Sequence, residues 1–167
     1  MARDPVFVLD ASVFIEAARR YYAFDLAPRF WELLIQLAES GQIESIDRVR
    51  QELERGNDDL TKWASSEFHQ AFASTDDQDV IASYGGIIQW VTSQPQFLDA
   101  AKAEFANGAD GWLVAYAKAR GRVVVTQEVP NPEVRRKVPI PNVCQAFNVA
   151  FVDTFEMLRR LGVRWTR

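Results

Sequence analysis

The chain has 167 residues, 48% of them hydrophobic and 25% charged, which is typical of one soluble domain over residues 1–167. Its formal net charge of −4 argues against a protein that coats nucleic acid through a basic surface. Cys144 is the only cysteine and His69 the only histidine, which excludes an intramolecular disulfide, a cysteine-based zinc site and paired-histidine catalysis. Acid–base chemistry at neutral pH therefore falls to carboxylates, Lys, Tyr or water activated by a metal.

The sequence contains no apolar run that approaches the ~20 residues needed to cross a bilayer. The first predicted strand follows Met1–Pro5 directly, without the pattern of a signal peptide. We therefore expect a cytoplasmic protein that does not contact a membrane.

Short apolar runs predict the strands, and helical spacing of apolar residues predicts the helices between them. The predicted strands are Val6–Leu9, Ile43–Ile46, Val123–Val125 and Val149–Val152. The predicted helices are Val13–Arg20, Phe30–Ser40, Arg48–Arg55 after an Asp47 cap, Asp58–Phe72, one opened by Thr75 with Gln78 as its capping-box partner, Gly111–Arg120 and Thr154–Leu161. The segment Val129–Asn142 carries four prolines and predicts a structured loop. Strands separated by helices indicate an α/β fold with a mostly parallel sheet covered on both faces.

Four carboxylates fall at positions that this fold would bring together. Asp10 and Glu128 follow two apolar strands, where open parallel sheets place their ligands. Asp110 begins the helix that leads into the second of these strands, and Glu52 lies in a short helix. Clustered carboxylates repel one another unless a cation neutralises them, and hard oxygen ligands suit Mg²⁺ or Mn²⁺. Such an ion can activate water against a phosphodiester without any histidine.

The sequence resembles the PIN-domain ribonucleases of the VapC type. The resemblance rests on the segments VFVLDASVFIEA, SIDRVRQELERG, ADGWLVAYAKARG and VVVTQE, and it continues into KVPIPNVCQAF and TFEMLRRLGV. It implies a Rossmann-like three-layer α/β/α sandwich, Mg²⁺- or Mn²⁺-dependent cleavage of RNA, frequent homodimers and, for toxins of type II toxin–antitoxin pairs, an antitoxin partner.

The family's functional positions map onto this chain one at a time. The resemblance implies that Asp10, Glu52, Asp110 and Glu128 are the catalytic and metal-binding acids, and that Ser12 and Thr126 support them. The chain departs from the family pattern at two of these positions. Ser12 stands where an asparagine is frequent, and Glu128 replaces the more usual aspartate and reaches about one methylene further.

Basic and aromatic residues near these acids are candidates for substrate contact. Arg135, Arg136 and Lys137 lie in the proline-rich loop after Glu128, and we expect them to bind the phosphate, with Lys137 foremost. Arg19 and Arg20 follow the Asp10 helix and are weaker candidates. Trp112 is expected to pack in the interior, with base stacking as the alternative.

The sequence allows two other functional interpretations. A phosphatase of the haloacid dehalogenase type also begins with an apolar strand that ends in aspartate, but it needs a second aspartate where this chain has Ser12. A PIN-fold module that binds RNA or protein without catalysis would keep the fold and lack metal binding. Hydrolysis of RNA and metal titration separate these possibilities.

Overall fold

A computed structural model describes residues 3–165 of the chain. Five parallel strands form one sheet in the order β3-β2-β1-β4-β5. The strands are β1 (Phe7–Leu9), β2 (Ile43–Ile46), β3 (Phe72–Ala73), β4 (Val123–Val125) and β5 (Phe151–Val152). The helices are α1 (Ala11–Glu16), α2 (Pro28–Glu39), α3 (Asp47–Glu54), α4 (Asp59–Ser66), α5 (Gln78–Ser93), α6 (Asp99–Asn107), α7 (Asp110–Arg120), α8 (Ile140–Ala146) and α9 (Thr154–Arg160). A π-helical turn, η1 (Ala17–Tyr21), extends α1, and a 3₁₀ turn, η2 (His69–Ala71), precedes β3.

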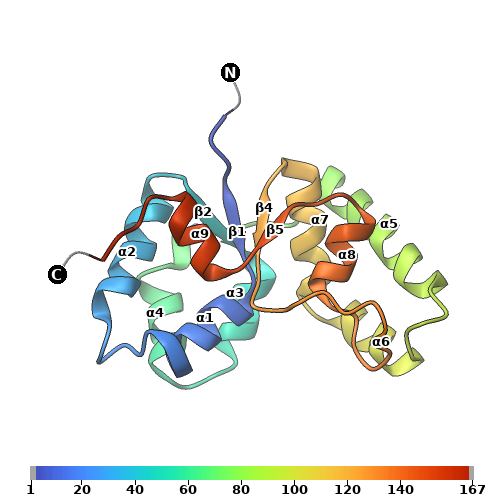
Figure 1. The fold of residues 1–167 in the computed structure, drawn as a ribbon, viewed down its shortest axis with the longest axis horizontal. Helices are drawn as coiled ribbons and strands as arrows, with labels where there is room; N and C mark the ends of the chain where they lie inside the picture. Colours follow the sequence, from blue (N-terminus) through green and yellow to red (C-terminus); the bar gives the residue numbers. More distant parts are fainter. Residues whose placement is uncertain (1–2, 166–167) are drawn as a thin grey trace.

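Helices cover both faces of the sheet, which confirms the predicted three-layer α/β architecture. In Figure 1 the strands stand in the middle, with α1, α2, α4 and α9 on one side and α5, α6, α7 and α8 on the other. The central strand β1 is buried along its whole length because both of its faces meet helices. Cys144 is buried and His69 is exposed. Within residues 3–165 there is no helix with the length and apolar character of a membrane span.

The structure corrects the predicted middle of the chain. The segment predicted as one helix, Asp58–Phe72, is divided into α4, η2 and the edge strand β3. The helix assigned to Thr75 begins only at Gln78, and neither residue forms a capping box. Thr75 instead donates its backbone N–H and its hydroxyl to the Asp47 carboxylate, at 3.2 and 2.9 Å. Asp47 is the first residue of α3 rather than the residue before it, and its carboxylate also accepts the Arg48 N–H at 2.8 Å, so it joins the start of α3 to this loop.

The second half of the chain differs from the prediction in two helices. Helix α6 is not among the elements predicted from the sequence, although Ala101 and Phe105 on this helix are buried. The proline-rich segment is a loop only up to Pro139, because α8 begins at Ile140 and carries Pro141 in its first turn. Proline fits a first turn because its missing N–H has no helical partner there. The loop before α8 passes close to the carboxyl ends of the strands.

Candidate active site

The site begins where β1 and β4 end beside each other. Leu9 is in register with Val125, and the Asp10 backbone N–H donates to the Val125 carbonyl at 2.9 Å. Asp10 and Thr126 are the next residues on the two parallel strands, so their side chains emerge at the same edge of the sheet. The Thr126 hydroxyl donates to Asp10 Oδ2 at 3.0 Å.

A hydroxyl network fixes the orientation of the Asp10 carboxylate. Ser12 Oγ, in the first turn of α1, also donates to Asp10 Oδ2, at 2.6 Å. Each hydroxyl in turn accepts a backbone N–H: Ser12 from Gln127 at 3.0 Å, and Thr126 from Glu128 at 3.1 Å. Asp10 is only 4% exposed, so both hydroxyls compensate part of the cost of burying its charge.

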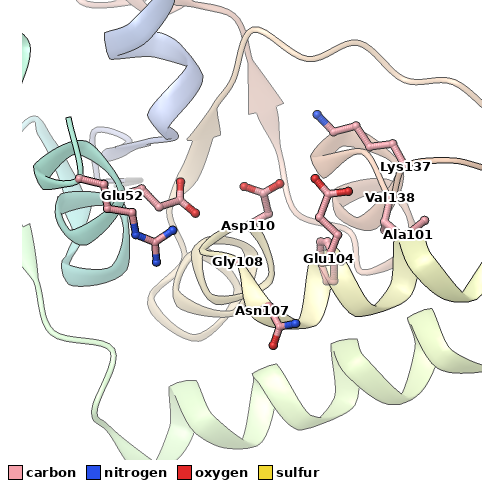
Figure 2. Close-up of a pocket in the computed structure, with 10 residues that line it drawn as sticks. Glu52, Ala101, Glu104, Asn107, Gly108, Asp110, Lys137 and Val138 are labelled. Atoms are coloured by element: carbon pink, nitrogen blue, oxygen red, sulfur yellow. The ribbon is translucent and has the colours of Figure 1, made fainter.

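Glu52 and Asp110 meet at the N-terminus of α7. Asp110 is the first residue of this helix, and Glu52 Oε1 accepts the backbone N–H of the preceding Ala109 at 3.1 Å. Glu52 thus satisfies one of the free donors at the start of α7 and joins α3 to it. Figure 2 shows the Glu52 and Asp110 side chains directed toward the same space.

The electrostatics of Asp10 and Asp110 show that their charges are not fully compensated. Burial, followed by the negative charges of Asp10, Glu128 and Glu52, raises the pKa of Asp110 to about 8. Burial and the charge of Glu128 raise the pKa of Asp10 to about 6, although the bonds from Ser12 and Thr126 favour its ionised form. Asp10 is close enough for its charge to act on Asp110, and two neighbouring buried carboxyls with raised pKa values are typical of a functional site.

Glu128 has other partners in this structure. Its Oε1 forms an ion pair with Lys137, and its Oε2 accepts the backbone N–H of Ile140 at 2.8 Å. Both carboxylate oxygens are therefore bound to the loop and to the start of α8. The charge of Lys137 also lowers the pKa of Asp110, against the larger effects that raise it.

A cleft of about 560 Å³ opens over Asp110 between α3, α6 and the loop before α8 (Figure 2). Besides Glu52, Asp110 and Lys137, it is lined by two charged residues that the sequence reading missed, Arg55 and Glu104. Arg55 lies one helical turn after Glu52, so its position in the sequence already places it on the same side of the helix as Glu52. Glu104 lies on the unpredicted helix α6, and its side chain lines the same cleft as Asp110 (Figure 2).

The donor set at this cleft suits a hard divalent cation. Among residues 3–165, no three His, Cys, Asp or Glu side chains converge closely enough to hold one metal ion. Within the described residues, neither Asp10 nor Asp110 forms an ion pair. Mg²⁺ is commonly bound through one or two carboxylates, with water and substrate phosphate as its other ligands. The residues present therefore fit an ion of the Mg²⁺ or Mn²⁺ type held by Asp10 and Asp110.

The remaining candidates lie outside the cleft or have structural partners. Arg135 and Arg136 are exposed and are absent from the cleft lining, whereas Lys137 lines it. Trp112 stacks on Tyr84 with ring centroids 3.8 Å apart, and the Arg48 guanidinium lies 3.9 Å from the Trp112 ring centre. Two groups at such distances cannot share one face of the ring, so both faces are covered and Trp112 packs rather than stacking on a base.

Comparisons with solved structures give the class of this fold. The chain is similar to VapBC2 from Rickettsia felis, a complex crystallised with a DNA fragment from its promoter. The two share 14% identity and superpose with a TM-score of 0.56 over 89% of this chain and 98% of that chain. It is also similar to FitAcB from Neisseria gonorrhoeae, with 18% identity and a TM-score of 0.52 over 87% of this chain and 96% of that one. At these identities the likeness concerns the fold, and it confirms the predicted PIN-like α/β fold.

The amino-acid sequence itself matches one family. Residues 7–165 match the family described as a domain of unknown function, DUF4411, and the chain belongs to that family. No curated protein matches the chain.

Proposed function

We propose that this protein is a metal-dependent endoribonuclease that hydrolyses RNA phosphodiester bonds, as the toxin of a type II toxin–antitoxin pair. The observation that carries the proposal is the pair formed by Asp10 and Asp110. These two desolvated carboxylates, from the end of β1 and the start of α7, have pKa values raised by burial and by neighbouring negative charge. The PIN-like fold and the cleft over Asp110 support the same activity.

The residues of the cleft divide the chemistry among them. When bound, Mg²⁺ or Mn²⁺ supplies the positive charge that neutralises the acids, attracts the scissile phosphate and lowers the pKa of a water molecule. Asp10, oriented by Ser12 and Thr126, and Asp110 would hold the ion. Glu52, fixed by the Ala109 N–H, would orient the attacking water, and Glu128 would complete the acidic set. Lys137 would bind a phosphate oxygen of the substrate.

Cleavage of single-stranded RNA with added Mn²⁺ or Mg²⁺ tests the activity. We expect Asp10→Asn and Asp110→Asn to lower kcat/KM by at least about 10²-fold, because each removes a charge that the metal needs. Asp25→Asn, in the exposed loop between η1 and α2, is the matched control and should cleave as the wild type does. Equal cleavage by Asp10→Asn and the wild type would contradict the proposal.

A PIN-fold module without catalysis is the second candidate, and the Lys137–Glu128 ion pair favours it. A lysine that neutralises an acid of the site can replace the charge of a metal in a protein that binds RNA or protein partners. Titration of the protein with Mn²⁺ by calorimetry distinguishes the two. Binding by the wild type that is lost in Asp110→Asn supports the nuclease, and no binding by either supports the module.

An antitoxin and a second copy of the chain are the proposed protein partners. The resemblance to VapC-type toxins and the likeness to VapBC2 support the antitoxin. Expression of the chain alone should arrest growth, and co-expression of a small neighbouring gene should restore it. Sedimentation analysis of the purified chain tests the homodimer. Growth that is unaffected by the wild type would contradict the toxin role and leave the hydrolytic activity to its own test.

A further inference from the structure

Side chains from three helices meet at Trp112, two residues after Asp110 in α7. The Tyr84 ring, from the neighbouring helix α5 (Figure 1), lies parallel to the Trp112 ring, with the centroids 3.8 Å apart and 8° between the planes. On the other face the Arg48 guanidinium, from α3, lies 3.9 Å from the ring centre. None of these three residues lines the cleft over Asp110, so they act on the site only through the helices that carry its acids.

The two side chains that enclose Trp112 are themselves anchored. The Tyr84 hydroxyl donates to the Ala106 carbonyl at 2.9 Å, near the end of α6. Arg48 Nε donates to the buried Thr75 hydroxyl at 3.2 Å. In the part of the chain that the structure describes, Arg48 forms no ion pair. The negative face of the indole ring is therefore a direct partner of its charge, and Trp is the aromatic side chain that attracts a cation most strongly.

The place of Trp112 on α7 determines what this enclosure does. Successive residues of an α-helix are turned by about 100°, so a side chain two positions after Asp110 points from nearly the opposite side of the helix. Holding Trp112 between two anchored groups therefore opposes rotation of the first turn of α7 about its axis. Such a rotation would move the Asp110 carboxylate, and the groups of a functional site must stay within about 0.5 Å of their productive positions.

Helix α3 contacts this turn at two points. Arg48 and Glu52 are four residues apart in α3, so they lie on the same side of it. Glu52 accepts the Ala109 N–H at 3.1 Å, and Arg48 lies over the Trp112 ring. Asp110 falls between these two points of attachment, so α3 fixes the turn on both sides of this acid in the sequence.

We infer that Arg48, Trp112 and Tyr84 are positioning residues, which hold the first turn of α7 in the orientation that directs Asp110 toward a metal ion. This inference rests on the proposed function and adds to it residues that touch neither the metal nor the substrate. The Arg48 charge distinguishes positioning from filling of space. Arg48→Met keeps a long side chain without the charge, whereas Arg48→Lys keeps a cation that can lie over the ring.

Hydrogen exchange of the metal-free protein in EDTA tests the hold on the helix. The Leu113 N–H bonds the Ala109 carbonyl at 2.9 Å in this turn. Arg48→Met should raise the exchange rate of this amide about 3- to 10-fold relative to amides in the last turn of α7, because local opening of the first turn becomes easier. A general loss of stability would raise both rates alike. Arg48→Lys should exchange as the wild type does.

Metal binding and turnover test the consequence for Asp110. By calorimetry, Arg48→Met should raise the Kd for Mn²⁺ about 3- to 10-fold, and it should lower kcat about 10-fold with KM for RNA unchanged, because the residues that line the cleft remain. Arg48→Lys should restore both quantities to within about twofold of the wild type. Trp112→Leu removes the ring and should reproduce the effects of Arg48→Met, whereas Trp112→Phe keeps an aromatic face and should lose less.

Arg122→Met is the matched control. Arg122 is also half-buried, and its Nε donates to Glu44 at 2.8 Å, the same acid that accepts the Tyr116 hydroxyl at 2.9 Å. This arginine therefore holds α7 beyond its first turn, and its loss should leave the Leu113 exchange ratio, the Mn²⁺ affinity and kcat unchanged.

The outcomes separate the inference from the proposed function. Mn²⁺ affinity and kcat of Arg48→Met equal to those of Arg122→Met would overturn the inference and leave the nuclease intact. Equal losses in Arg48→Met and Arg48→Lys would also overturn it, because the cation would then have no part in the effect. A wild type that neither binds Mn²⁺ nor cleaves RNA overturns the proposed function, and the inference falls with it.

Discussion

Lys137 forms an ion pair with Glu128 at the edge of the acidic centre, so one of the four acids is already neutralised by the chain itself. The Ile140 N–H holds the other Glu128 oxygen at 2.8 Å, and Lys137 is itself more than half exposed. Burial lowers the pKa of Lys137, but the hydrogen bond and the charge of Glu128 outweigh this effect and raise it, so the side chain stays charged. Glu128 can bind a metal or substrate only if this pair opens.

Lys137→Met should therefore strengthen metal binding while it weakens substrate binding. Removing the competing cation frees Glu128 and increases the negative field at Asp10 and Asp110, so we expect the Kd for Mn²⁺ to fall about 3- to 10-fold. The Km for RNA should rise by a similar factor because a phosphate contact is lost. Calorimetry and turnover measure the two effects, and Arg136→Met in the same loop is the control. An unchanged Mn²⁺ affinity would show that the pair does not compete with the metal.

Asp110→Asn should stabilise the metal-free protein at alkaline pH. The pKa of Asp110 is about 8 in the folded chain against an ordinary value of 3.8, so between these values the folded state binds the proton more tightly than the unfolded state. The free energy of unfolding should then fall as pH rises from about 4 to 8. Asn removes the repelling charge and should add roughly 1–3 kcal/mol at pH 8 and little at pH 4.

Urea denaturation in EDTA at both pH values measures this effect. Asp25→Asn, at an exposed position, should leave the stability unchanged at both. Added Mn²⁺ should stabilise the wild type more than Asp110→Asn, because only the wild type keeps the full ligand set. Asp110→Asn that is less stable than the wild type at pH 8 would contradict the account of repulsion.

The parts of the fold that the sequence predicted are those in which local pattern and tertiary packing agree. The apolar runs that became β1, β2 and β4 are buried because the central strands are covered on both faces. The edge strand β3 has two residues and is defined by its pairing with Ser45 and Ile46, which no local pattern encodes. Helix α8 was not predicted because Pro139 and Pro141 favour a loop in the local sequence pattern. In the structure Pro139 directly precedes the helix and Pro141 lies in its first turn, where proline is tolerated.

In the site, too, local features could be predicted from the sequence and tertiary contacts could not. Asp10 and Asp110 could be placed because a strand end and a helix start are local features. The ion pair of Glu128 could not be predicted because it depends on the path of the loop that brings Lys137, nine residues later, back to this acid. The place of Glu104 at the site could not be predicted because it lies on α6, which was not among the predicted helices. Arg55 needed the cleft to distinguish it from an ordinary exposed arginine.

Ser12→Ala should move the pH dependence of metal binding upward. Ser12 donates to the Asp10 carboxylate and favours its charged form, so its loss should raise the pKa of Asp10 above about 6. Mn²⁺ affinity should then fall by about 3- to 10-fold near pH 6 and by less at pH 8, where Asp10 ionises in both proteins. Titrations at the two pH values measure the difference. Ser40→Ala, whose hydroxyl bonds the Leu37 carbonyl at the end of α2, is the control. An equal loss at both pH values would indicate a structural effect instead.

Gly111→Ala should destabilise the protein even though alanine is the better helix former. A Cβ at Gly111 would lie 2.9 Å from Phe105 Cε1 and 3.1 Å from Tyr84 Cε2, and Phe105 is only 4% exposed and has no room to withdraw. We expect a net cost of about 1–2 kcal/mol. Gly85→Ala is the matched control, because it lies in the exposed middle of α5 with no atom within 4 Å, and it should gain about 1 kcal/mol. Urea denaturation of both variants should therefore give changes of opposite sign. Equal gains would show that α7 does not need glycine beside Asp110 for its close contact with α5 and α6.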